Sequence, residues 1–179
     1  MPMTRFAPAQ KILFAINAAG GIAVLGSYAV GLGSGTDALW GGVPAAIRPL
    51  YAVSMLVSAL GYFAFIYYLL FKVQPESASI GSGGKFQLFN WIFVGILLPS
   101  ALWMPLTNLY IGSPSEASWL AIRAVLALVG LASIALSAAL IQLRGNARGA
   151  SYRLAVAGSL YFAFHTTVLD AVVWAALFR

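Results

Sequence analysis

Five long apolar runs constrain this chain more than any other feature of its sequence. They cover residues 11–33, 49–73, 86–111, 118–143 and 152–178, and short polar segments separate them. A helix of about 20 apolar residues crosses the hydrocarbon core of a bilayer. Only 8% of the residues are charged, against about 25% in a soluble domain. The predicted fold is therefore all-α: residues 1–179 form one polytopic membrane domain, a bundle of five transmembrane helices.

The residue inventory excludes several kinds of chemistry. The chain has no cysteine, one histidine and four acids, so a disulfide, a thiol nucleophile and a protein-built metal site are not expected. The net charge of +6 comes from basic residues scattered singly between apolar runs. This distribution is typical of topology signals rather than of a nucleic-acid surface. Residues 1–10 are short, and the apolar run that follows is predicted to be a retained first span.

The basic residues also predict the orientation. Seven lie at one side of the predicted membrane and three at or near the other: Arg5, Lys11, Lys72, Lys85, Arg144, Arg148 and Arg153 against Arg48, Arg123 and Arg179. Positive charge is retained on the cytoplasmic side. We therefore expect a protein of an inner membrane, with the amino terminus in the cytoplasm and the carboxyl terminus outside.

Two connecting segments differ in character. The segment 34–48 is rich in glycine and proline around Trp40, so it is expected either to fold over the helix ends as a lid or to anchor Trp40 at the membrane interface. The segment 74–85 contains several glycines and serines and predicts a flexible cytoplasmic linker. In the second span, Tyr67, Tyr68 and Phe71 predict an interfacial aromatic belt, and the deeper Tyr62 needs a hydrogen-bond partner.

The last and third spans carry the residues that suggest a site. Asp170 is the only acid inside a predicted span, and a carboxylate at that depth is expected to face a partner or a cavity. At 1.5 Å per residue, Asp170 lies about 12 Å and Arg123 about 8 Å below the outer helix ends, so the two are predicted to pair. Pro99 and Pro105 predict a kinked third helix beside a cavity, or a kinked helix that only packs.

The candidate ligand-binding residues gather around this predicted pair in the outer half of the bundle. They are Trp40, Trp103, Pro105, Asn108, Arg123, His165, Thr166, Asp170 and Trp174. Three interpretations of the group stay open: a structural ion pair, the wall of a ligand pocket, and a proton relay through His165 and Asp170. Thr166 and Asp170 are expected to share one helix face, because they are four residues apart.

The segment 102–105, with Trp103 and Pro105 in the third of five spans, resembles the translocator protein family (tryptophan-rich sensory proteins, TspO-like). Trp40, Pro44 and Pro49 fall where that family has a Trp- and Pro-rich first loop. Two features depart from the family pattern: Ser100 stands where an Asn is usual, and the first loop lacks a dense Trp-x-Pro-Pro run. The resemblance implies a pocket for porphyrins or other flat lipophiles, and a tendency to dimerise.

The function expected first is that of an integral membrane protein that binds, senses or carries a lipophilic ligand, porphyrin- or sterol-like, in the outer half of the bundle. A second expectation is an accessory or scaffold subunit of a larger membrane complex. A third is an intramembrane enzyme that uses His165 and Asp170, although the scarcity of reactive side chains favours binding over catalysis. The expected partners are the lipid bilayer, a lipophilic small molecule, and a second copy or a membrane-complex subunit.

Overall fold

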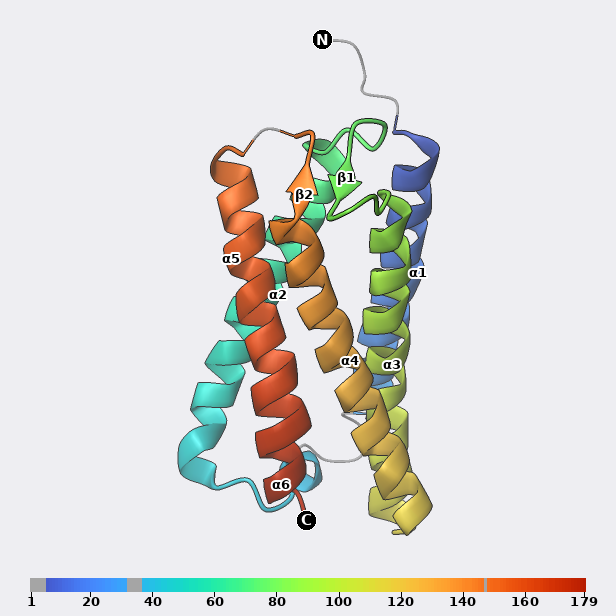
Figure 1. Ribbon diagram of the computed structural model, residues 1–179. Helices are drawn as coiled ribbons and strands as arrows, with labels where there is room; N and C mark the ends of the chain where they lie inside the picture. Colours follow the sequence, from blue (N-terminus) through green and yellow to red (C-terminus); the bar gives the residue numbers. More distant parts are fainter. Residues whose placement is uncertain (1–5, 32–36, 147) are drawn as a thin grey trace.

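The computed structural model describes residues 6–31, 37–146 and 148–179, and in this part of the chain five long helices form one bundle (Figure 1). The five spanning segments run over Pro8–Gly31, Ala45–Phe71, Gln87–Gly112, Glu116–Ile141 and Ala150–Leu177, and each is long and apolar enough to cross a membrane. In a bilayer the backbone must satisfy its own hydrogen bonds, which a helix does within one segment. The chain is thus a five-span integral membrane protein, as the sequence predicts.

The elements follow one another with short connections. The long helices are α1 (Pro8–Gly31), α2 (Arg48–Phe71), α3 (Gln87–Gly112), α4 (Glu116–Ile141) and α5 (Ala150–Phe164). The last span continues from α5 through the π-helix η4 (His165–Trp174) into the short α6 (Ala175–Leu177). Two short 3-10 turns, η2 (Asp37–Trp40) and η3 (Ala45–Ile47), precede α2. Pro99 and Pro105 both lie inside α3, which is one uninterrupted helix.

The helices are arranged as an open ring. α1 packs on α3, α3 on α4, α4 on α5 and η4, and α5 on α2, whereas α1 and α2 touch only slightly. The hydrogen bonds that join α1 to α2 in the described chain come from Gln10, which donates to three carbonyls at the end of α2, and from Asn17, which accepts from Tyr62. Tyr62 thus has the partner that its depth requires. Beyond Asn17, α1 depends on α3 for its packing.

We call the two ends of the bundle the sheet end and the cap end (Figure 1). At the sheet end, β1 (Ser79–Ile80) pairs antiparallel with β2 (Leu143–Arg144), in the register Ser79 with Arg144 and Ile80 with Leu143. The prediction of a flexible linker over 74–85 is therefore wrong, because backbone pairing with the segment after α4 orders it. At the cap end, residues 37–47, the cap segment, lie beside the carboxyl terminus.

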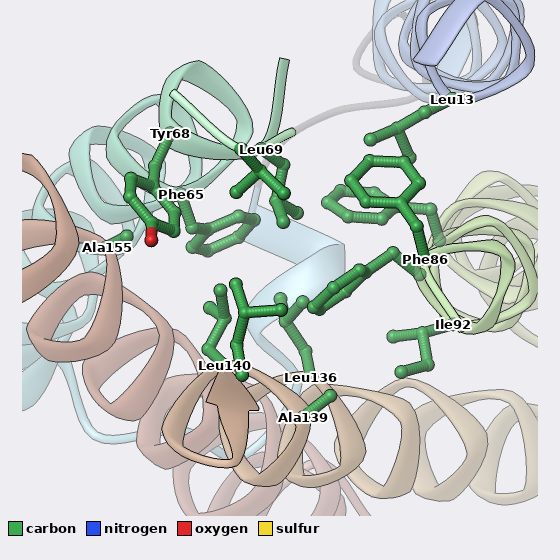
Figure 2. Close-up of a cluster of buried hydrophobic side chains, with 14 of the residues drawn as sticks. Leu13, Phe65, Tyr68, Leu69, Phe86, Ile92, Leu136, Ala139, Leu140 and Ala155 are labelled. Atoms are coloured by element: carbon green, nitrogen blue, oxygen red, sulfur yellow. The ribbon is translucent and has the colours of Figure 1, made fainter. Parts of the chain in front are cut away.

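The main hydrophobic core lies toward the sheet end (Figure 2). Phe65 and Leu69 of α2 meet Phe86 before α3 and Leu140 of α4, and all four side chains are at most 1% exposed. Tyr68 belongs to this core and is 1% exposed, so its prediction as part of an interfacial belt is wrong. α2 presents a buried stripe of residues three and four positions apart toward α5, and Tyr68 continues that stripe: Tyr51, Ser54, Ser58, Gly61, Phe65 and Tyr68.

α2 and α5 approach each other closely where they cross at Gly61 and Gly158. A Cβ atom added at Gly158 would lie 2.7 Å from the Cα atom of Gly61, and one added at Gly61 would lie 2.7 Å from the Gly158 carbonyl oxygen. Both neighbours are backbone atoms, which cannot turn aside as a side chain can. Small residues at such a crossing let two membrane helices pack by direct backbone contact.

Gly158→Ala is expected to reduce the free energy of unfolding by about 1–3 kcal/mol, because the new methyl group must push two backbones apart. The measurement is the melting temperature of the detergent-solubilised protein. Gly21→Ala is the matched control, since a Cβ at that glycine of α1 meets nothing within 4 Å. Equal melting temperatures for the two variants would contradict a tight α2–α5 crossing.

Candidate functional site

A chain of polar side chains crosses from α2 to the last span on the cap side of the glycine crossing. The Tyr161 hydroxyl donates to Ser54 Oγ at 3.0 Å, and Ser54 Oγ lies 2.9 Å from His165 Nδ1. His165 Nε2 lies 3.6 Å from Asp170 Oδ1. Ser54 and His165 are both 6% exposed. A histidine, an acid and two hydroxyls thus form a continuous line in the interior of the bundle.

One assignment of the protons satisfies every group in this line. Ser54 Oγ accepts from Tyr161, so its own hydrogen is available to donate to His165 Nδ1. The imidazole then carries its proton on Nε2, which faces Asp170. The separation of 3.6 Å is longer than a normal hydrogen bond, so the contact is electrostatic in character.

The π-helix η4 explains why His165 rather than Thr166 meets Asp170. In a π-helix the backbone hydrogen bonds join residues five apart and a turn takes more residues than in an α-helix, so residues i and i+5 come onto the same side of the helix. His165 and Asp170 have this spacing, and both lie in the π-helical segment, which begins at His165. The sequence predicts that Thr166 and Asp170 share one helix face, and in the described chain no hydrogen bond joins these two side chains. The Thr166 hydroxyl donates instead to the Phe162 carbonyl at 2.9 Å.

The predicted ion pair between Arg123 and Asp170 is also wrong. Both residues lie within the described chain, and no ion pair within 4 Å joins them. Arg123 is exposed and lines an open groove of about 570 Å³ between α4 and the last span. The groove residues from the last span are Ala171, Val172, Ala175, Ala176 and Arg179. The depths of the two charges matched, but the π-helix turns Asp170 onto the face of His165.

Three aromatic rings connect the remaining helices near Asp170. Tyr28 of α1 lies 5.8 Å from Trp103 of α3, and Trp103 lies 5.5 Å from Trp174 of η4, measured between ring centroids. Trp174 is four residues beyond Asp170 and is 5% exposed. We call Tyr28, Trp103 and Trp174 the aromatic wall. Two of the site residues predicted from the sequence, Trp103 and Trp174, are therefore in contact.

The aromatic wall includes polar atoms without partners. Trp103 Nε1 and, one turn further along α3, Asn108 Oδ1 are buried and accept or donate no hydrogen bond within the described part of the protein. A buried polar group left unpaired costs about 1–3 kcal/mol. Both atoms are shielded in this structure, so another molecule reaches them only by displacing side chains around them.

The carboxylate of Asp170 faces the slight contact between α1 and α2. It lies close enough to the phenol groups of Tyr28 and Tyr51 to interact with them electrostatically. The Tyr51 hydroxyl itself donates to the Leu169 carbonyl at 2.8 Å. The Asp170 side chain is 32% exposed, whereas the His165 side chain is 7% exposed. Asp170 is thus the accessible end of the polar line.

Residues 37–47 of the predicted lid segment 34–48 pack against the last span next to the aromatic wall, and residues 34–36 lie outside the described residues. Trp174 Nε1 donates to the Leu39 carbonyl at 3.1 Å, and the Gly42 amide donates to the Phe178 carbonyl at 3.3 Å. Trp40 packs edge-on against Tyr51, with ring centroids 5.9 Å apart. Trp40 therefore belongs to the lid.

The predicted site residues separate into three groups. His165, Asp170, Trp103 and Trp174 belong to the polar line or the aromatic wall, and Trp40 covers them. Thr166 and Asn108 are close in sequence to these groups. The Thr166 hydroxyl, however, donates its hydrogen bond to a backbone carbonyl of its own helix. Pro105 and Arg123 are exposed and lie outside the site. No group of three or more potential metal ligands occurs in the ranges that the structure describes.

Sequence reasoning missed Ser54, Tyr28 and Tyr51. Ser54, Ser58 and Gly61 are spaced by four and three residues, which marks one face of a helix, and this small polar stripe in an aromatic span was the available signal. The sequence offers no comparable signal for Tyr28, because its role depends on which helices become neighbours.

Comparisons of the chain with models of known protein families, with curated proteins and with solved structures find no match. The fold defines a class, a five-span integral membrane protein, and no family is assigned to it.

A double-mutant cycle tests the polar line. Ser54→Ala and His165→Ala are expected to be non-additive in the free energy of unfolding, by about 0.5–3 kcal/mol, because each removes the partner of the other. The Arg123→Gln and Asp170→Asn cycle is the control and should be additive, since those side chains do not pair. Additivity in the first cycle, or coupling in the second, would contradict the arrangement described above.

Proposed function

We propose that this membrane protein binds, senses or carries a lipophilic ligand at the aromatic wall. The observation that carries the proposal is the meeting of an accessible acid, three large aromatic rings and buried unpaired polar atoms at one place. Ligand sites are mostly apolar and aromatic, with a few polar groups that fix orientation. Toward the sheet end the core cluster consists of apolar and aromatic side chains, and the buried polar groups there include Gln10 and Asn90, of which Asn90 Oδ1 also lacks a hydrogen-bond partner in the described chain.

The arrangement of α1 supports access to this site from the bilayer. Gln10 and Asn17 fasten α1 to α2 in the half of the bundle at the sheet end. Tyr28, which contacts the site, lies beyond that fastening. A lipophile dissolved in the membrane would enter between α1 and α2 at the cap end. The resemblance of the Trp103 and Pro105 element to TspO-like proteins is a separate reason to expect a flat ligand such as a porphyrin or a sterol.

A second candidate function is that of a subunit in a larger membrane assembly, and α1 favours it. Only 6% of its apolar window is buried in the bundle. Gly21 and Gly26 both face open space, where the backbone of another helix would fit. A second copy of this chain or a different membrane protein would cover this face. This role is compatible with ligand binding.

Catalysis by the polar line has less support. Ser54, His165 and Asp170 have the residue types of a nucleophile, a base and an acid. However, Ser54 is buried, and its oxygen is engaged by both Tyr161 and His165. The side chains of the polar line are therefore better suited to orienting the Asp170 carboxylate than to supplying a nucleophile.

Trp103→Ala is expected to weaken the binding of 1-pyrenemethanol, a flat neutral lipophile, about tenfold or more, because it removes the central ring of the wall. Saturable pyrene anisotropy in zwitterionic nanodiscs measures the affinity. Trp91→Ala is the matched control: it is a tryptophan on the same helix, 74% exposed and far from the wall. An equal loss of affinity in both variants, or a loss of melting temperature that parallels the loss of affinity, would favour simple packing.

The proposed orientation places the sheet end in the cytoplasm, since most of the basic residues lie there. The natural chain has no cysteine, so single substitutions give unique labels. Ala46→Cys in the cap segment is expected to react with a membrane-impermeant maleimide in intact cells. Ser82→Cys next to β1 should react only after the membrane is opened. The reverse pattern would overturn the orientation.

A further inference from the structure

Asp170 is an acid without a basic partner. Of the other three acids, Asp37 pairs with Arg48 at 3.2 Å and Glu116 pairs with Arg179, while Glu76 lies in the loop at the sheet end. No lysine or arginine in the described chain lies within 4 Å of Asp170, and its contact is with His165. The other oxygen of the carboxylate, Oδ2, has no hydrogen-bond donor among the described residues.

A carboxylate at this depth needs a positive charge or strong donors to offset its loss of hydration. His165 Nε2 lies 3.6 Å from Oδ1, beyond normal hydrogen-bond distance, so neither carboxylate oxygen accepts a hydrogen bond from a described residue. The phenols of Tyr28 and Tyr51 interact electrostatically with Asp170, and Trp174 lies four residues beyond it in η4. The faces of such rings attract cations. An acid among aromatic rings therefore favours an ammonium group over a neutral or an anionic one.

The polar line holds the carboxylate in place for such a ligand. Tyr161 and Ser54 fix the imidazole of His165, and the imidazole faces Asp170 from the buried side. The exposed side of Asp170 faces the seam between α1 and α2, which carries hydrogen bonds only at Gln10 and Asn17 in the described residues. A charged headgroup can thus reach Asp170 while the apolar part of the same molecule stays against α1 and the wall.

We propose that the ligand of this site is a lipophilic amine, whose ammonium group binds the Asp170 carboxylate among Tyr28, Tyr51 and Trp174. This inference rests on the proposed function and specifies its ligand class. The ammonium supplies the charge that no side chain of the described chain supplies, and the aromatic wall binds the hydrocarbon part.

The experiment compares two probes that differ only in charge, 1-pyrenemethylamine and 1-pyrenemethanol. The full chain is placed in zwitterionic nanodiscs, empty nanodiscs give the background, and pyrene anisotropy gives the affinity. The wild-type protein is expected to bind the amine about tenfold or more tightly than the alcohol. Asp170→Asn should remove this preference, measured as the ratio of the amine and alcohol affinities of the same variant. Asp37→Asn, which changes an exposed acid in the cap segment, should keep the preference.

The outcomes separate the two proposals. Equal affinities of the wild type for amine and alcohol, both saturable and both weakened by Trp103→Ala, would overturn the amine inference and leave the lipophile site standing. A preference for the amine that survives in Asp170→Asn would overturn it too. No saturable binding of either probe would overturn the proposed function itself. The wild-type comparison needs no variant, so the test holds even where a substitution prevents folding.

Discussion

The backbone contact between Gly61 and Gly158 sets the geometry on which the site depends. It brings the backbones of α2 and α5 into direct contact, because neither position has a side chain. Ser54 lies seven residues before Gly61, and His165 lies seven residues after Gly158. In antiparallel helices both offsets are two turns, about 10 Å toward the cap end. The short hydroxyl of Ser54 reaches the imidazole only because the crossing is this tight.

The π-helix extends the line that the crossing begins. A change of backbone pairing from α5 to η4 places Asp170 under His165 instead of toward Arg123. π-Helical turns cost hydrogen-bond geometry and occur often at functional sites. Here the turn points the one membrane-embedded acid toward α1 and α2. The same turn brings Trp174 to the cap segment, where its indole nitrogen bonds Leu39.

Each end of the bundle is built for a different task. At the sheet end, Gln10 satisfies carbonyls that the end of α2 leaves open, and apolar side chains fill the space between the helices. At the cap end, a second buried cluster packs large aromatic rings with Ile122 and Leu126 beside the polar line. Among the described residues, no hydrogen bond joins α1 to α2 at this end. A stable end that supports an adaptable one suits a protein that receives its ligand from the bilayer.

The sequence by itself determined the five spans, because only a helix satisfies its backbone in lipid and about 20 apolar residues suffice to cross it. It also singled out His165, Asp170, Trp103 and Trp174, since charged and polar groups within spans are costly. It could not decide which faces meet. The depth of a residue along a helix follows from its residue number. The direction of its side chain about the helix axis does not, because a π-helical turn changes that direction. Only the tertiary structure therefore turned Asp170 away from Arg123 and brought Ser54 and Tyr28 to the site.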